Sequence, residues 1–533
     1  MSEEPVDVLI VGAGAAGAAF AWSLAETRMN VVCLEQGGWM KPEEYPTAGI
    51  DWEMRRLGDF GMSPNSRGRK EDYPINDSES PIAVSNFNAV GGSTILYAAH
   101  FPRFHPGDFK IKTLDGVGED WPVDYQRLAP YYDLNSRIMG VAGLAGDPAN
   151  PPHDFPLPPV PPGKIGERFA KGFNKLGWHW WPSDSAIATR DYEGRAKCIN
   201  LGPCIMGCAQ GAKGSTDVTY WPLAVRQGVE VRTHCRVREV TLGTNGLADG
   251  VIYYDADGIE RKQKAEIVVI ACNGVGTPRL LLNSVSKEFP DGLANSSGLV
   301  GKNLMLHPYA MVNGVFDEPI EGYKGPTGCC LMSQEFYETD LSRGFVRGYT
   351  IETLRGNGPV STALAGLGGD IPWGAEHHRE FANRFDRSAG MVMICEDLPE
   401  QHNSVTIDAD LVDSDGIPSP KLNYRLSENS QKMLEHCVAR GTDVLRAAGA
   451  SEISAQAPLQ PAGWHLMGTT RMGTDPAKSV VNEWGRSHDV KNLFIIDGSI
   501  FVTAAAVNPT NTIQALTLYI ADTIKKNLSN LFD

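Results

Sequence analysis

The chain has 533 residues, of which 42% are hydrophobic and 21% are charged, and its formal net charge at pH 7 is −16. This composition is typical of a soluble globular protein, and the length favours two domains over one core. The strong negative charge argues against nucleic acid and against an anionic membrane surface as binding partners.

The first predicted element is a strand from Val6 to Val11 that leads into the turn Gly12-Ala13-Gly14-Ala15-Ala16-Gly17. This run matches G-x-G-x-x-G at the junction of a strand and a helix, which is where the dinucleotide-binding motif occurs. Gly12 allows the tight turn, Gly14 lets the backbone approach a pyrophosphate, and Gly17 lets the helix lie close to the sheet. We expect the pyrophosphate at the helix N-terminus, beside Ala15 and Ala16.

The N-terminal region also allows a membrane helix or a secretory signal to be considered. The uncharged run from Val8 to Ala25 is long enough to be considered as a membrane helix, but its small residues and its three glycines in register favour the nucleotide-binding turn. The residues before Val6 are acidic and contain no basic or apolar region of a secretory signal. A cytoplasmic protein without a membrane span is therefore expected.

Two later features complete the first half of the predicted nucleotide site. A strand from Asn30 to Leu34 ends in Glu35, about twenty residues after the glycines, where a carboxylate accepts hydrogen bonds from an adenosine ribose and repels a 2′-phosphate. Further on, Gly91-Gly92-Ser93-Thr94 forms a second glycine pair followed by hydroxyl groups. Such a turn can bring its backbone close to a flat ring or a phosphate.

The second half of the chain contains further strand–helix junctions of the nucleotide-binding type, separated by a region with a different hydrophobic pattern. A buried strand, Ile267 to Ala271, leads into a helix for which Thr277 is the predicted N-cap and Pro278 the first helical residue. Residues 310–457 alternate in short segments, as in an antiparallel sheet. Near the C-terminus, the strand Leu493 to Ile496 ends in Asp497-Gly498, and Asn508-Pro509-Thr510 begins a helix. Chain start and chain end are thus predicted to build one domain.

These motifs together resemble the glucose-methanol-choline (GMC) family of FAD-dependent oxidoreductases over nearly the whole chain. The resemblance also includes Gly301-Lys302-Asn303-Leu304 before His307, and the run from Gly463 to Met472 around His465. It implies an α/β fold, α+β in part, in which a Rossmann-like FAD-binding domain is assembled from residues 1–50, 85–130, 215–310 and 458–533. Residues 51–84, 131–214 and 311–457 are expected to form the substrate-binding domain and its connecting segments, with a mostly antiparallel sheet.

The family implies oxidation of an alcohol to a carbonyl, with a histidine as base and hydride transfer to N5 of the flavin. His465 matches the catalytic histidine and Asn508 the residue that binds the substrate hydroxyl, whereas His307 is interpreted as structural and His100 has no supporting context. The expected cofactor-binding residues are Gly12, Gly14, Ala15, Ala16, Gly17, Glu35, Gly91, Gly92, Ser93, Val237, Asp497, Gly498, Asn508, Pro509 and Thr510.

Within the family, the pattern is most similar to the pyranose oxidase and the gluconate and glucoside dehydrogenase branch, so a sugar, glycoside or polyol is the expected substrate. Oxygen, a quinone or a cytochrome remains open as the electron acceptor. Some pyranose oxidases attach FAD to a histidine shortly after the glycine pair, where this chain has Leu96. Non-covalent FAD is therefore expected. A lyase that keeps FAD only structurally, and a flavin subunit whose partner does the chemistry, are the alternatives.

Cys198, Cys204 and Cys208 are spaced as in GMC dehydrogenase subunits that pass electrons through a three-iron cluster to a cytochrome. Similar cysteine-rich segments occur in family members without a cluster, and Ala209 replaces the proline that is common after the last cysteine of cluster loops. A cytochrome-linked subunit with this cluster is therefore a possible but not the favoured interpretation. Buried free thiols without metal are expected instead.

Overall fold

Strand β1 (Ser2–Val11) lies inside a seven-stranded sheet in the computed structural model, which describes residues 2–328, 330–355, 358–364 and 371–527. The apolar residues Val8, Leu9 and Ile10 are fully buried, and strands lie on both sides of β1 within the sheet. The other strands of this sheet are β2 (Val31–Leu34), β5 (Glu230–Arg232), β6 (Arg236–Leu242), β7 (Ala248–Tyr254), β8 (Glu260–Ile270) and β16 (Leu493–Ile495).

The sheet combines a parallel part and an antiparallel part in the order β5-β2-β1-β8-β7-β6. β5, β2, β1 and β8 are mutually parallel, whereas β7 and β6 continue as an antiparallel pair. β16 joins the C-terminal half of β8 in parallel, through the pairs Leu493 with Val268 and Ile495 with Ile270. The carboxyl ends of β1, β2, β8 and β16 therefore lie at one edge, which is where open α/β sheets bind their ligands.

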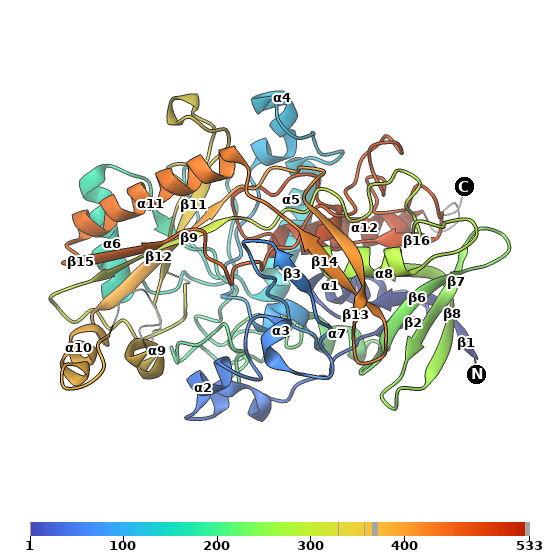
Figure 1. Ribbon diagram of the computed structural model, residues 1–533, viewed down its shortest axis with the longest axis horizontal. Helices are drawn as coiled ribbons and strands as arrows, with labels where there is room; N and C mark the ends of the chain where they lie inside the picture. The colour runs from blue at the N-terminus through green and yellow to red at the C-terminus, as the bar shows by residue number, and fades with distance from the viewer. Residues whose placement is uncertain (1, 329, 356–357, 365–370, 528–533) are drawn as a thin grey trace.

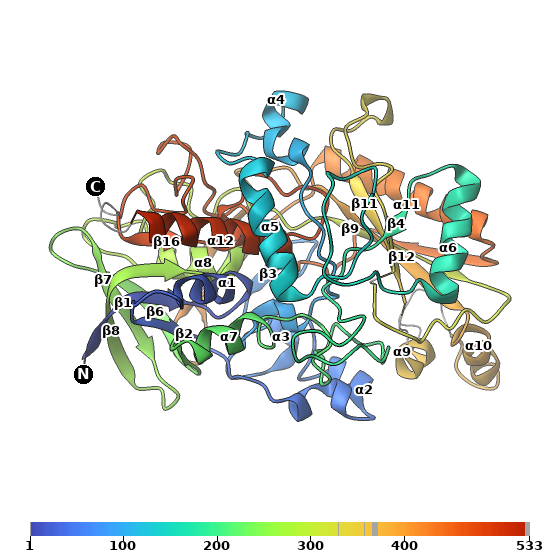
Figure 2. The same cartoon turned by 180° about the vertical axis from the view of Figure 1, so that it is seen from behind.

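Helices from both ends of the chain cover this sheet. α1 (Ala15–Leu24) packs against α12 (Thr510–Lys526) and α7 (Tyr220–Arg226), and its small residues allow the close approach. α5 (Tyr125–Met139) lies beside α12, as Figure 2 shows. Strand β1 and helix α12 lie in the same half of the molecule (Figure 1). The prediction that the two ends of the chain share one Rossmann-like domain is confirmed.

The second layer is a six-stranded, fully antiparallel sheet in the order β15-β9-β12-β11-β10-β4. Helices α6 (Gly163–Leu176) and α11 (Glu428–Ala448) cover one of its faces with an apolar core (Figure 1). This agrees with the antiparallel sheet predicted for residues 310–457, although β4 comes from an earlier segment. Its strands are β4 (Trp181–Pro182), β9 (Tyr309–Val315), β10 (Leu331–Ser333), β11 (Tyr349–Leu354), β12 (Ser388–Cys395) and β15 (Glu452–Gln456).

A small third sheet has the strand order β13-β14-β3. It consists of β13 (Ser404–Val412), β14 (Pro418–Asn423) and β3 (Asn76–Glu79). The short helices are α2 (Trp52–Arg56), α3 (Pro64–Arg67), α4 (Ile111–Asp115), α9 (Pro359–Ala363) and α10 (His377–Arg384). The domain boundaries expected from the sequence stay a prediction.

The predicted start of the helix after β8 is wrong. α8 runs from Asn273 to Asn283 and contains Pro278 in its interior. Asn273 supplies the cap, because its side-chain oxygen accepts from the backbone N–H groups of Val275 and Gly276. Pro278 has no N–H for the carbonyl of Gly274, but the hydroxyl of Thr469 donates to that carbonyl at 2.8 Å and replaces the missing bond.

The membrane-helix interpretation of residues 8–25 is also wrong. These residues form the end of β1, the glycine turn and α1. No helix in the described part of the chain combines the length and the apolar character that crossing a bilayer requires. The cytoplasmic location stays a prediction.

Candidate active site

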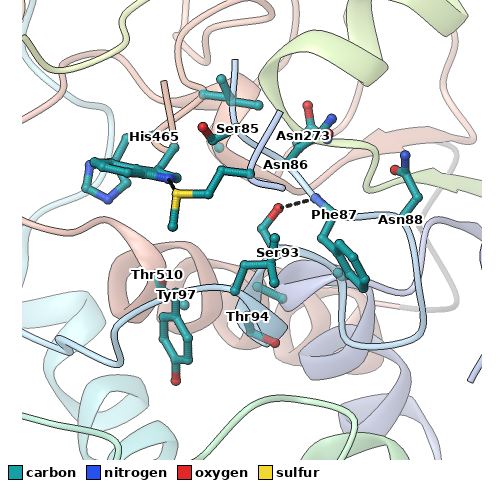
Figure 3. A pocket seen from close by; sticks show the side chains of 18 of the residues that line it. Ser85, Asn86, Phe87, Asn88, Ser93, Thr94, Tyr97, Asn273, His465 and Thr510 are labelled. Atoms are coloured by element: carbon teal, nitrogen blue, oxygen red, sulfur yellow. Dashed lines mark hydrogen bonds between the residues drawn. The ribbon is translucent and has the colours of Figure 1, made fainter. Parts of the chain in front are cut away.

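A cavity of about 380 Å³ lies at the edge where the parallel strands end and continues to the antiparallel sheet. Figure 3 shows His465 on one side of it, Asn273 on another, and Ser93 joined to the backbone of Phe87 between them. Of the residues predicted from the sequence, most line this cavity: Gly12, Gly14, Ala15, Ala16, Glu35, Gly92, Ser93, Val237, His465, Asp497, Gly498, Asn508, Pro509 and Thr510. Gly17 and Gly91 lie behind its wall.

The two glycine turns are in direct contact. The N–H of Gly91 donates to the carbonyl of Ala13 at 2.9 Å, and a Cβ at Gly92 would lie 2.8 Å from the Cα of Gly14. Gly91 and Gly92 have φ of 105° and 53°, which glycine adopts without strain. The second turn thus holds the first turn in place through its backbone. Gly91 can do this without facing the cavity.

Glu35 lies at the end of β2 and is nearly fully buried. Its carboxylate accepts hydrogen bonds from the backbone N–H groups of Ala13 and Gly37, both at 2.8 Å. Burial raises the pKa of Glu35 to about 7, although these hydrogen bonds act in the opposite direction. The acid therefore ties the glycine turn to β2 and also lines the cavity.

Asp497 connects the ends of β16 and β8. Its carboxylate accepts from the hydroxyl of Thr277 at 2.6 Å, from the N–H of Asn273 at 3.1 Å and from the N–H of Ser499 at 2.8 Å. Burial nevertheless raises its pKa. The side chain of Thr277, predicted as a helix cap, is thus used to hold Asp497 at the cavity.

His465 belongs to a chain of two histidines and a backbone carbonyl. Nε2 of His307 lies 2.6 Å from the carbonyl oxygen of Ala505, and Nδ1 of His307 lies 2.8 Å from Nδ1 of His465. A carbonyl only accepts, so the proton of His307 is on Nε2. Burial lowers the pKa of His307 to about 4, which leaves its Nδ1 as an acceptor. His465 must therefore donate from Nδ1 and keeps an unprotonated Nε2.

The surroundings of His465 also keep its ring neutral. Burial lowers its pKa well below 6.5, and His307 and His100 add to this effect because a second positive charge nearby is unfavourable. The hydroxyl of Tyr309 lies 3.2 Å from Nδ1 of His465. His307 is completely buried and does not line the cavity, so it acts on His465 and not on a ligand.

Asn508 lies between the turn after β16 and α12. Its side-chain oxygen is buried and has no hydrogen-bond partner among the described residues. Buried polar groups in folded proteins are normally satisfied, so an unpaired amide oxygen at a cavity indicates a missing ligand group. Asn508 and His465 line the same cavity, as expected from the sequence.

The sequence missed two polar residues of this cavity, His100 and Glu352. Both are almost fully buried, and Nε2 of His100 lies 3.2 Å from Oε2 of Glu352. No motif surrounds His100 in the sequence, so no pattern indicates a role for it. A signal for Glu352 did exist, since it is the lone charged residue of strand β11, but strand periodicity alone does not tell which face a ligand contacts.

The three clustered cysteines lie in a loop near the cavity, where the neighbouring Pro203, Ile205 and Met206 contribute to its wall. Burial raises the pKa of Cys204 to about 11 and also raises that of Cys198. Across residues 2–527, apart from the three short gaps, no three His, Cys, Asp or Glu side chains are placed to hold a metal ion. Lys213 contacts the carbonyls of Tyr97 and Cys204, which orders the loop without metal.

The iron content of the protein stays a prediction. We expect little or no iron in anaerobically purified protein, because burial raises the pKa of the Cys198 and Cys204 thiols and protein hydrogen bonds already order their loop. Iron and acid-labile sulfide measured against flavin test this directly. A value of about three irons per flavin would contradict the prediction and indicate a cluster on Cys198, Cys204 and Cys208.

Comparison with known proteins agrees with this geometry. Residues 158–309 and 399–517 match two family models described as GMC oxidoreductase, and residues 10–68 match an NAD(P)-binding Rossmann-like domain. The chain is 43% identical to 2-methyl-1,2-propanediol dehydrogenase of Mycolicibacterium austroafricanum over 100% of its own length and 97% of that protein. It is 30% identical to the fructose dehydrogenase large subunit of Gluconobacter japonicus over 99% of both.

The chain belongs to the GMC oxidoreductase family. It is therefore an oxidoreductase that acts on alcohols, and the family implies FAD as its cofactor. Two solved structures have the same fold at low sequence identity. A formate oxidase variant of Aspergillus oryzae aligns over 100% of both chains with a TM-score of 0.70 and 14% identity, and pyridoxine 4-oxidase aligns over 98% of this chain and 99% of its own with a TM-score of 0.64 and 17% identity.

The cavity fits this cofactor. A Cβ at Gly14 would meet no atom within 4 Å, so the first glycine turn has open space in front of it where a pyrophosphate needs to approach. The hydroxyls of Tyr73 and Ser85 and both amide atoms of Asn86 are buried at the cavity and lack hydrogen-bond partners within the described residues. These groups can be satisfied by a large polar ligand such as FAD.

FAD is expected to be bound without a covalent bond. Leu96 lines the cavity at the position where some relatives attach the flavin through a histidine, and a leucine side chain cannot form that bond. Denaturation should therefore release all of the yellow cofactor into the supernatant. Flavin fluorescence that stays with the protein band on a denaturing gel would contradict this.

Proposed function

We propose that this enzyme oxidises a hydroxyl group of a polyol, sugar or glycoside to a carbonyl, with His465 as the base. The observation that carries the proposal is the 2.8 Å contact between Nδ1 of His465 and Nδ1 of His307, whose Nε2 lies at the carbonyl of Ala505. From this contact we infer that Nδ1 of His465 donates and that its Nε2 is unprotonated, in a residue that lines the cavity. Relatives named for 2-methyl-1,2-propanediol, fructose and paromamine support an alcohol with further hydroxyl groups as substrate.

Each residue of the site has a defined task in this proposal. Nε2 of His465 accepts the proton of the substrate hydroxyl as the C–H bond breaks and the C=O bond forms. The amide of Asn508 holds the hydroxyl oxygen without competing for the proton. The two glycine turns, Glu35 and Asp497 hold the cofactor. When bound, FAD supplies the acceptor for the hydride. In a separate half-reaction, oxygen, a quinone or a cytochrome takes up the electrons.

The test is anaerobic mixing of the purified holoenzyme with polyols, sugars and glycosides. An alcohol that is a substrate should bleach the flavin absorption near about 450 nm in a single turnover. A flavin that stays oxidised with every alcohol would overturn the proposal and would favour the lyase alternative, in which FAD is only structural.

The rate of this bleaching should not depend on pH in the neutral range. His465 must be neutral to act as a base, and its pKa is held well below 6.5 by burial and by two neighbouring histidines. The base form is thus fully present above pH 6.5, and the rate falls only when the pH drops toward the lowered pKa. Stopped-flow reduction from pH 6 to 8.5 measures this. An acid limb with an apparent pKa of 6.5 or higher would contradict the assigned environment.

A further inference from the structure

The antiparallel sheet has two faces. Helices α6 and α11 cover one face, and the other face forms a wall of the cavity. On this wall, Met311, Val392 and Glu352 lie side by side on three neighbouring strands, because Val392 pairs with both of the others. Leu354 and Trp464 extend the same wall. A carboxyl group thus sits within an otherwise apolar surface, where its burial has no evident structural benefit.

The polar atoms of this wall are not satisfied by the protein. Nδ1 of His100 lies 2.8 Å from the hydroxyl of Ser183, which fixes the ring. Nε2 of His100 is 3.2 Å from Oε2 of Glu352, but the geometry does not form a hydrogen bond. Within the described residues, both Nε2 of His100 and Oε1 of Glu352 are therefore buried without a hydrogen-bond partner. Two such atoms at one cavity indicate a polar group of a ligand.

This polar pair is close to the proposed base. His100 is near enough to His465 to lower its pKa, and Glu352 is near enough to Tyr309 to raise the pKa of its phenol. The hydroxyl of Tyr309 in turn lies 3.2 Å from Nδ1 of His465. A compact molecule can therefore reach His465 with one group and the pair with another.

The surroundings favour a neutral group over a cation at this position. Burial raises the pKa of Glu352 well above 4.5 and lowers that of His100 to about 3, so burial favours the uncharged form of both side chains. The cavity also contains the cationic Arg355, whose guanidinium donates to the carbonyl of Pro326. A carboxylic acid and a neutral imidazole can each exchange a hydrogen bond with a hydroxyl group, whereas an ammonium group would require an ionised acid.

We propose that Glu352 and His100 bind a second hydroxyl group of the substrate, so that the enzyme selects compact vicinal diols over alcohols with one hydroxyl. This inference rests on the proposed function, the oxidation of an alcohol at His465. The apolar side chains of Met311, Leu354 and Val392 contact the carbon skeleton between and around the two hydroxyls. A site built to hydrogen-bond a hydroxyl discriminates strongly against the analogue that lacks it, because its buried groups are then left unpaired.

The experiment compares three alcohols that differ at one carbon: 1,2-propanediol, 1-propanol and 2-amino-1-propanol. With the wild-type holoenzyme, kcat/KM for anaerobic flavin reduction should be at least about 100-fold higher for the diol than for 1-propanol. The amino alcohol, which is cationic at neutral pH, should be no better than 1-propanol. Preference for the amino alcohol would show that the pair recognises a cation and would overturn the inference.

Three variants locate the effect. Glu352→Leu should lower kcat/KM for the diol about 100-fold, mainly through KM, and change that for 1-propanol less than about threefold. The isosteric Glu352→Gln keeps a polar group but loses the acidic O–H, and it should lower the diol value roughly tenfold. Glu452→Gln is the matched control, since Glu452 lies exposed on the edge strand β15 of the same sheet and away from the cavity. It should change neither value.

The outcomes separate this inference from the proposed function. A wild type that is bleached by no alcohol refutes the function itself. A wild type that reduces its flavin with 1-propanol as fast as with the diol, or with sugars and not with 1,2-propanediol, overturns only the diol inference. An equal loss for both alcohols in Glu352→Leu would also overturn it. If Glu352→Leu loses FAD, Glu352→Gln is measured in its place. A ratio of kcat/KM for the diol to kcat/KM for 1-propanol that equals the wild-type ratio then counts against the inference.

Discussion

Replacing His465 by alanine is expected to slow alcohol-driven bleaching of the flavin by ~10² to 10⁴-fold while FAD stays bound. The variant removes the unprotonated Nε2 that takes the substrate proton, whereas the glycine turns that hold the cofactor do not contact His465. Stopped-flow reduction and the ratio of FAD to protein measure the two parts of this expectation. His402→Ala is the control, because His402 is an exposed histidine outside the cavity.

Asn508→Ala should cost less, roughly 1 to 3 kcal/mol of transition-state stabilisation, because it removes one hydrogen bond to a buried hydroxyl. The double variant should lose less than the sum of the two single losses, since both residues act on the same oxygen. Strict additivity would show that the two side chains contact different groups. A His465→Ala enzyme that is bleached at the wild-type rate would remove His465 from the mechanism.

Two substitutions in the first glycine turn are expected to have different effects, one on cofactor binding and one on the stability of the fold. Gly14→Ala adds a methyl group to open space at the cavity, and its φ of −76° suits alanine, so the protein without FAD should keep its Tm. The methyl group occupies the approach of the pyrophosphate, and FAD affinity should fall at least about tenfold, which is about 1.4 kcal/mol.

Gly17→Ala is expected to act on the fold instead. A Cβ at Gly17 would lie 2.0 Å from the carbonyl oxygen of Gly12, so α1 would have to move away from β1. Overpacking of this kind costs typically ~1 to 3 kcal/mol or more, and the apoprotein should melt at a lower temperature. Calorimetry of both apoproteins and FAD titration distinguish the routes. Equal melting temperatures for the two variants would contradict the assigned roles of the glycines.

The sequence predicted the parts of the site that depend on local backbone geometry. The turn at Gly12, the strand ending in Glu35 and the segment from Asp497 to Thr510 each carry a pattern that requires a particular conformation, and the strands around them place these ends at one edge of a sheet. The start of α8 was wrong because the side chain of Thr469, distant in sequence, repairs the helix around Pro278.

The substrate side of the cavity was not predictable in the same way. His100 and Glu352 are separated by about half of the chain, and their contact exists only because β11 presents Glu352 on the wall of the cavity while Ser183 fixes the ring of His100. Neither residue belongs to a motif. Their roles require no special backbone geometry, so the neighbouring residues show no recognisable sequence pattern. The role of His307 required atom positions, because only the carbonyl of Ala505 determines its tautomer.

The assembly of the nucleotide-binding sheet from distant segments has a consequence during synthesis. β16 completes the edge of the sheet, Asp497 holds Asn273, and α12 packs on α1, so residues about 500 positions apart must meet. Contacts of this range form late and slow folding. During synthesis on the ribosome, the first glycine turn emerges long before the segments that pack against it. Until those segments emerge, its apolar strand β1 is unpaired. FAD can be retained only after residues 497–510 have joined the rest of the site, so cofactor binding follows the meeting of these distant segments.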